Sequence, residues 1–235
     1  IIVSDDYKTY TIRLREGIKW HKPGGIDLND PKYGWMAGDH FLTSRDVLFS
    51  LQTILHPQVD NGFVKNYYED VDLEHCELLD ERTIAIRWKK KTYQSLSSTV
   101  GLTVIPEWFY SRDEYGNEFP EESFGLNFNQ HWYNNKGLVG AGPYRMVEYS
   151  PGEFIKLERN EDYFGDLPAI RQIVYPIYSD PDLELLKLKA GEHTFGGLAP
   201  RQYREQIQKW ADVPAERRPK DNPFLNGQIS HETMI

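Results

Sequence analysis

Three side chains near the start of the sequence are of types that ligate metal ions. His21, Asp39 and His40 border a segment rich in Gly, Pro, Asp and Asn that runs from Lys22 to Gly38. If that segment folded back, imidazole and carboxylate groups would meet, as in many metal sites. No fixed spacing links the three residues. A metal-dependent hydrolase is therefore kept as an alternative, and no metal or cofactor is predicted.

Other patterns that could support catalysis are incomplete. The acidic runs at 70–74 and 180–184 alternate like a calcium loop but lack its central Gly and distal Glu, which indicates solvated acidic faces. The Gly-x-Gly at 140–142 leads into a strand pattern rather than a helix, which favours a tight turn over a dinucleotide fingerprint. The common hydrolase and phosphate-loop motifs are absent from the sequence. The sequence therefore favours a protein that is not an enzyme.

A pair of tyrosines offers a different kind of chemistry. Tyr67 and Tyr68 follow Phe63 closely, and aromatic side chains provide large, flat contact areas for organic ligands. The residues alone favour packing of these tyrosines in a core or on the surface over contact with a ligand. Composition leaves the function open, since an aromatic content of 14% suits a large core as well as a ligand site.

Charge and composition exclude several classes of protein. A formal net charge of -9 opposes non-specific attraction to nucleic acid or to anionic membranes, so no nucleic-acid partner is expected. Cys76 is the only cysteine, which rules out an intrachain disulfide. No apolar run approaches the about 20 residues that span a bilayer. The sequence opens without Met or a leader, so we expect that it was cut from a longer protein.

The periodicity of apolar residues predicts a mixture of strands and helices. Alternation predicts a strand at 10–14 and a hairpin at 76–88. The turn residues at 150–153 predict a second hairpin at 144–158, and 170–178 is predicted to be a further strand. A capping box at 43–46 opens a predicted helix that ends before Pro57, and Pro181 and Pro200 open two more. The segments 22–38 and 107–135 are predicted to be a surface excursion and an insertion or long loop. After Asp212 the chain is polar and rich in Pro, which is typical of a tail or linker that has no apolar face to pack against a core.

Four ordered blocks resemble one protein family. They are YKTYTIRLREGIKWH at 7–21, FLTSRDVLFSL at 41–51, VGAGPYR at 139–145 with the PGE and LERNEDYFG that follow it, and AGE at 190–192. Together they resemble the bacterial extracellular solute-binding proteins of family 5, the peptide- and nickel-binding components of ABC transporters. Four blocks in order are far more specific than one short motif.

The resemblance implies an α/β fold of the periplasmic-binding-protein type II kind, of which this chain would be a fragment. Residues 1–138 would form an accessory subdomain of lobe I that is incomplete at its N-terminus. Residues 139–212 would form a portion of main lobe I, and 213–235 a linker or tail toward the absent second lobe. The segments 22–40 and 107–135 are longer than the family pattern, and His193-Thr194 replaces its Ile-Asp.

The resemblance also implies a function. The protein would be the substrate-binding receptor of an ABC importer, which captures a peptide-like or other small polar solute when its two lobes close. The implied ligand-binding residues are Tyr67, Tyr68, Gly101, Leu102 and Thr103. We expect a periplasmic or extracytoplasmic monomer that delivers its solute to an ABC permease; the resemblance leaves open whether the full-length protein carries a lipid anchor. Besides the hydrolase, a solute sensor for a membrane receptor remains an alternative.

Overall fold

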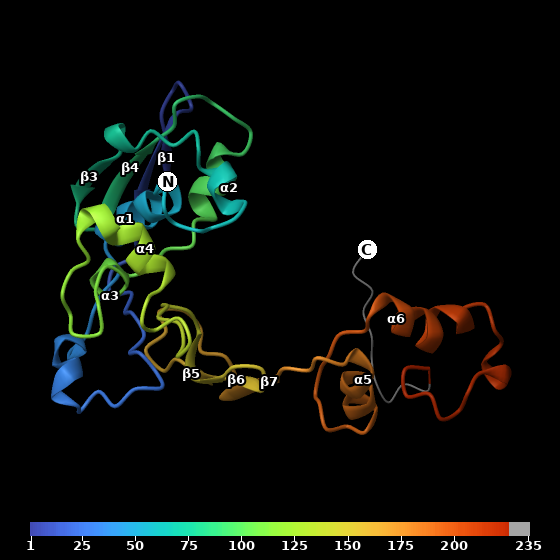
Figure 1. The fold of residues 1–235 in the computed structure, drawn as a ribbon. Coiled ribbons are helices and arrows are strands. Elements are labelled where there is room, and N and C mark those ends of the chain that lie inside the picture. Colours follow the sequence, from blue (N-terminus) through green and yellow to red (C-terminus); the bar gives the residue numbers. More distant parts are fainter. Residues whose placement is uncertain (226–235) are drawn as a thin grey trace. The chain divides into compact units, whose positions relative to one another are not determined.

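The computed structural model describes residues 1–225, which fold into two compact units divided between Tyr175 and Pro176 (Figure 1). Both helices and sheets are present, as predicted for an α/β protein. The strands are β1 (Ile2–Val3), β2 (Thr9–Arg13), β3 (Glu77–Asp80), β4 (Thr83–Arg87), β5 (Tyr144–Ser150), β6 (Phe154–Arg159) and β7 (Gln172–Pro176). The α-helices are α1 (Ser44–Leu55), α2 (Ser95–Val100), α3 (Glu107–Tyr110), α4 (Phe124–Asn129), α5 (Pro181–Lys189) and α6 (Pro200–Gln206).

The first unit begins with an antiparallel sheet of order β1-β2-β4-β3. The predicted alternation is confirmed, because Tyr10 lies opposite Ile86 and Ile12 opposite Ile84. Helix α1 lies beside this sheet, as Figure 1 shows. It begins after Thr43, as predicted, and ends at Leu55. Apolar residues of the helix, of the sheet and of the segments next to them form one core with these members: Tyr10, Val47, Leu51, Tyr68, Val71, Ile84, Ile86 and Trp88.

A second core corrects the prediction for the two long segments. Both were expected to be loops, yet Met36 of the first and Phe109 and Tyr133 of the second are almost fully buried. They pack together with Phe49 of α1, and the Tyr133 hydroxyl donates a hydrogen bond to the Gly24 carbonyl at 2.7 Å. The short helix η1 (Pro31–Met36), α3 and α4 lie in these segments. Helices of four to six residues are too short to show a periodicity, so composition alone suggested loops.

His131 lies inside this aromatic core as a neutral ring. Its Nδ1 accepts a hydrogen bond from the Tyr133 backbone N–H at 3.3 Å. Its Nε2 lies 3.3 Å from the Phe109 carbonyl and 3.1 Å from that of Arg112, which places the proton on Nε2. Burial lowers the pKa of His131 to about 4, and the two carbonyls offset only part of that effect.

His131 is therefore expected to make the fold sensitive to acid. Between pH 6.5 and about 4 the unfolded chain binds a proton at this position and the folded chain does not, so stability falls as the pH falls. The full effect is about 3 kcal/mol, of which about 2 kcal/mol is lost by pH 5. Urea unfolding at pH 7 and pH 5 measures it. A His131→Asn variant should lose this share of the pH dependence, and an unchanged dependence would contradict the assignment.

The remaining elements are a second sheet and a small helical unit. The predicted hairpin at 144–158 is confirmed as β5 and β6, with Gly152 at φ 80° in the turn, and β7 completes a sheet of order β5-β6-β7. In the second unit α5 begins at Pro181 and α6 at Pro200, as predicted. Within residues 1–225 no helix is long and apolar enough to cross a membrane.

The segment after Asp212 differs from its prediction. Phe224 is buried against Leu188 and Ile207, so the described part of the predicted tail does have a core contact. Residues 226–235 of the predicted linker lie outside the described residues. The assignments of 1–138, 139–212 and 213–235 to parts of the lobes stay predictions, and the boundary at 138/139 falls inside the first compact unit.

Candidate ligand-binding site

An open hollow of about 310 Å³ lies between the short helix η2 (Val64–Tyr67) and α2. The end of α1 and the extended chain after α2 complete its wall. Its lining residues are Ile54, Val64, Tyr67, Tyr68, Gln94, Ser97, Ser98, Gly101 and Thr103. A site of this size, apolar with a few polar groups, is typical of contact with part of an organic ligand.

Two hydrogen bonds, one part-buried and one buried, hold the back of this hollow. The Tyr68 ring is only 6% exposed, and its hydroxyl donates to the Ser98 carbonyl at 3.1 Å. Burial raises the pKa of Tyr68, so the hydroxyl keeps its proton and its role as donor. Behind α2, the Trp88 indole N–H donates to the Thr99 hydroxyl at 3.0 Å. Helix α2 is thus tied both to η2 and to β4.

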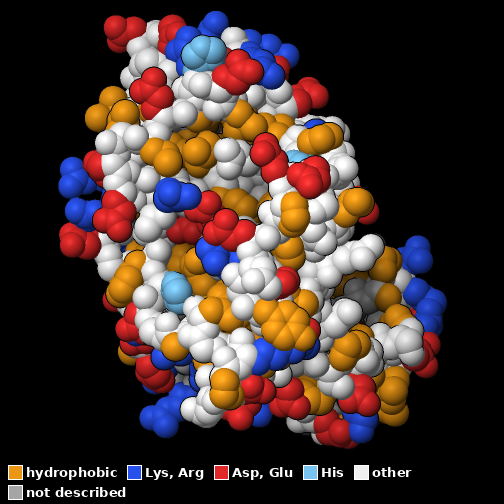
Figure 2. Space-filling model, turned by 60° about the vertical axis from the view of Figure 1, so that its left-hand side comes forward, with side chains coloured by type: hydrophobic (Ala, Val, Ile, Leu, Met, Phe, Trp, Pro, Cys, Tyr) orange, Lys and Arg blue, Asp and Glu red, His pale blue; other side chains and the backbone are white. Residues whose placement is uncertain are grey.

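The mouth of the hollow is apolar and open to solvent. Tyr67 is 47% exposed and Phe63 is 70% exposed, and their ring centroids lie 6.3 Å apart with the planes at 75°. Val64 adds a further exposed apolar side chain. On the face drawn in Figure 2, hydrophobic side chains likewise lie exposed among charged ones. Burial of Tyr67 by a ligand would remove apolar area from water at about 25 cal/mol per Å².

Four of the five predicted ligand-binding residues line this hollow. Tyr67, Tyr68, Gly101 and Thr103 come together there, whereas Leu102 packs against the first core. At Gly101 the backbone N–H donates to the Ser97 carbonyl at 2.8 Å. An added Cβ would lie 2.9 Å from that oxygen, so a side chain does not fit. Whether these residues bind a ligand stays a prediction.

The sequence reasoning missed the contribution of α2. Gln94, Ser97 and Ser98 line the hollow with amide and hydroxyl groups. The only signal for them in the sequence was a run of small polar residues between Tyr93 and the predicted binding residue Gly101. Since the helix has six residues, no apolar period indicated which of them face the hollow.

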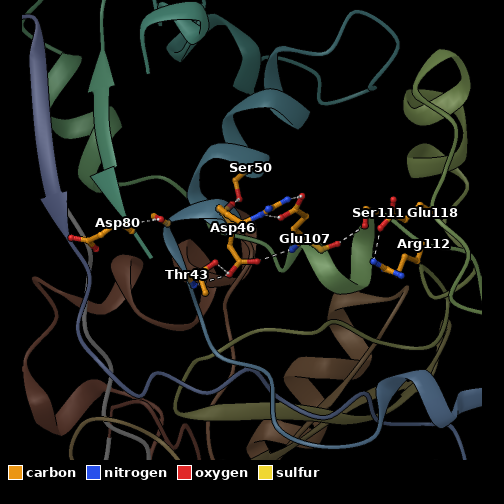
Figure 3. A network of polar contacts seen from close by, with 10 residues as sticks. Thr43, Asp46, Ser50, Asp80, Glu107, Ser111, Arg112 and Glu118 are labelled. Atoms are coloured by element: carbon orange, nitrogen blue, oxygen red, sulfur yellow. Dashed lines mark hydrogen bonds and ion pairs between the residues drawn. The ribbon is translucent and has the colours of Figure 1, made fainter. Parts of the chain in front are cut away.

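A polar network, drawn in Figure 3, links the first turns of α1 to α3. The Asp46 carboxylate accepts hydrogen bonds from the Thr43 backbone N–H and from the Glu107 backbone N–H, each at 2.8 Å. The Ser50 hydroxyl accepts one from the Ile105 N–H at 2.9 Å. Asp46 in the first turn of α1 and Ser50 in its middle therefore hold the chain that follows Thr103.

The three candidate metal ligands do not come together. His21 Nε2 lies 2.9 Å from the Gly142 carbonyl, Asp39 forms an ion pair with Lys19 at 3.0 Å, and the His40 ring stacks on Trp108 at 3.7 Å. Within residues 1–225 no group of three or more His, Cys, Asp or Glu side chains could hold a metal ion. The arrangement of these three residues therefore does not support the hypothesis of a metal-dependent hydrolase.

Comparison with known proteins identifies the architecture. Residues 2–225 match the family model described as bacterial extracellular solute-binding proteins, family 5 Middle. The oligopeptide-binding protein AppA of Bacillus subtilis is 30% identical over 199 residues, which are 83% of this chain and 31% of AppA. Di/tripeptide-binding protein 1 of Pseudomonas aeruginosa is 28% identical over 202 residues, or 81% of this chain and 33% of that protein.

A solved structure agrees with these matches. B. subtilis AppA in complex with a nonapeptide superimposes with a TM-score of 0.66 at 21% identity, over 87% of this chain and 35% of AppA. The fold is that of part of a type II periplasmic binding protein, and the chain spans about a third of the length of the curated relatives it matches. This chain belongs to the bacterial extracellular solute-binding proteins of family 5.

Proposed function

We propose that the whole protein is the solute-binding receptor of an ABC importer and that its ligand is peptide-like. One observation carries the proposal: in a chain of this family, Tyr67, Tyr68, Gly101 and Thr103 meet at a single hollow with an exposed aromatic wall. The relatives named above are oligopeptide- and di/tripeptide-binding proteins, which favours a peptide over other solutes.

In the proposed mechanism the protein closes on its ligand. The hollow beside Tyr67 is open to solvent and supplies one wall, so a ligand that also contacts the second lobe stabilises the closed form. The closed form is then what an ABC permease recognises. The receptor acts without catalysis, as a monomer in the periplasm or outside the cytoplasmic membrane, where a lipid anchor would hold it.

Calorimetry on the full-length protein tests this function. Di- to pentapeptides should bind saturably with one site, whereas nickel chelates and oligosaccharides of similar size should release or absorb no comparable heat. Binding should reduce the heat capacity, because apolar surface around Tyr67 leaves water. Saturable binding of a non-peptide solute, with no response to any peptide, would show that the proposed ligand class is wrong.

A further inference from the structure

We propose that the hollow beside Tyr67 receives an uncharged, apolar side chain of the ligand, and so makes the protein select peptides that carry one. The inference rests on the proposed function and adds the chemical class of the ligand group that this site binds. Tyr67 would be the residue that sets the preference.

The hollow carries no formal charge. None of its nine lining residues is Asp, Glu, Lys, Arg or His, although 27% of the chain is charged. A second hollow in the same unit, of about 380 Å³, differs in this respect, because Arg45, Glu107, Arg112 and Glu118 line it. A charged side chain that entered the hollow beside Tyr67 would lose water without gaining an ion pair, and such burial is costly.

The size of the hollow fits one part of a ligand. A volume of about 310 Å³ is at the lower end of the range of roughly 300–1,000 Å³ for sites that enclose a whole small molecule. An oligopeptide is larger, so the hollow would take one side chain and the adjoining backbone. The amide of Gln94 and the hydroxyls of Ser98 and Thr103 are neutral groups suited to that backbone.

The structure separates the fixed part of the site from the part available to a ligand. Tyr68 is buried and its hydroxyl is bonded to Ser98, so it supports the wall. Tyr67, packed edge to face on Phe63, remains half exposed. A rigid, exposed aromatic ring offers much contact area for little loss of side-chain entropy, which is the property of residues that dominate binding energy.

The test compares tripeptides that differ in one side chain. Ala-based tripeptides carrying Leu, Phe, Glu or Lys at each position in turn are titrated into the full-length protein. At the position that occupies the hollow, Leu and Phe should bind at least about tenfold more tightly than Glu and Lys. A Tyr67→Ala change should weaken the Leu and Phe peptides about tenfold and the Glu peptide less than about twofold. Tyr67→Phe should keep the preference.

Two further variants sharpen the test. Tyr93→Ala removes a tyrosine that is 92% exposed and does not line the hollow, so it should change no affinity. Gln94→Glu adds one negative charge to the lining at nearly constant shape and should favour the Lys peptide relative to the Leu peptide by about tenfold. Both variants should unfold at the same urea concentration as the parent.

The outcomes distinguish this inference from the proposed function. If the parent protein binds no peptide, the proposed function fails. If it binds peptides but prefers charged side chains, or if Tyr67→Ala weakens every peptide equally or none, the function stands and the inference about the hollow is overturned.

Discussion

Replacing Phe109 with alanine is expected to reduce the free energy of unfolding of the first unit by about 4 kcal/mol. The side chain is fully buried, and the rings of Trp35, Trp108 and Tyr133 surround it at centroid distances of 6.1, 5.4 and 5.1 Å. Truncating a buried Phe removes its transfer free energy and leaves a cavity that rigid rings cannot fill, which typically costs about 3–5 kcal/mol.

Tryptophan fluorescence during urea unfolding measures this loss, because Trp35, Trp108 and Trp132 all border the second core. The matched control is Phe63→Ala, which removes the same side chain from a position that is 70% exposed. That control should cost less than about 1 kcal/mol. Equal effects of the two substitutions would mean that the segments 22–40 and 107–135 do not share a packed core.

Replacing Asp46 with alanine is expected to cost about 3 kcal/mol. The carboxylate accepts from the backbone N–H groups of Thr43 and Glu107 and from the Thr43 hydroxyl, and its loss leaves these part-buried donors without their partner. An unsatisfied buried donor costs about 1–3 kcal/mol and the loss of a helix cap about 1 kcal/mol. Burial raises the pKa of Asp46, so these bonds also offset the cost of keeping a carboxylate out of water.

The neighbouring residue provides the control for this prediction. Arg45 is also at the start of α1 and pairs with Glu107 through two contacts of 3.1 Å, but its side chain is 70% exposed. Arg45→Ala should therefore change the unfolding free energy by about 0.5 kcal/mol or less. Both variants are compared by urea unfolding at pH 7. A loss for Arg45→Ala as large as that for Asp46→Ala would contradict the role assigned to the buried carboxylate.

The elements that the sequence predicted well have a regular apolar period or a clear turn. The strand around Tyr10 and the helix from Ser44 repeat their pattern over five or more residues, and the hairpin of β5 and β6 is marked by the Ser150-Pro151-Gly152 turn. The second core has no such pattern, because it joins residues about 100 positions apart, such as Gly24 and Tyr133. Contacts of that kind depend on tertiary packing, which single-sequence periodicity does not report.

The candidate site could likewise be predicted only in part from the sequence. Its position followed from the family resemblance, which pointed to Tyr67 and to the chain before Pro106. Leu102 does not line the hollow, because successive side chains of an extended chain point to opposite sides. Thr103 lines the hollow, whereas Leu102 and Val104 pack against the first core.

Hydrogen exchange of the full-length protein, with and without a saturating peptide, tests the central claim most directly. If the hollow beside Tyr67 is part of the binding site, amides in 63–68 and 94–103 should exchange at least about tenfold more slowly when peptide is bound. The bound peptide would cover these amides and suppress the local opening through which they exchange. The amides of β1 and β3, away from these segments in the sequence, should change little. Saturable peptide binding with no added protection in 63–68 and 94–103 would contradict the account.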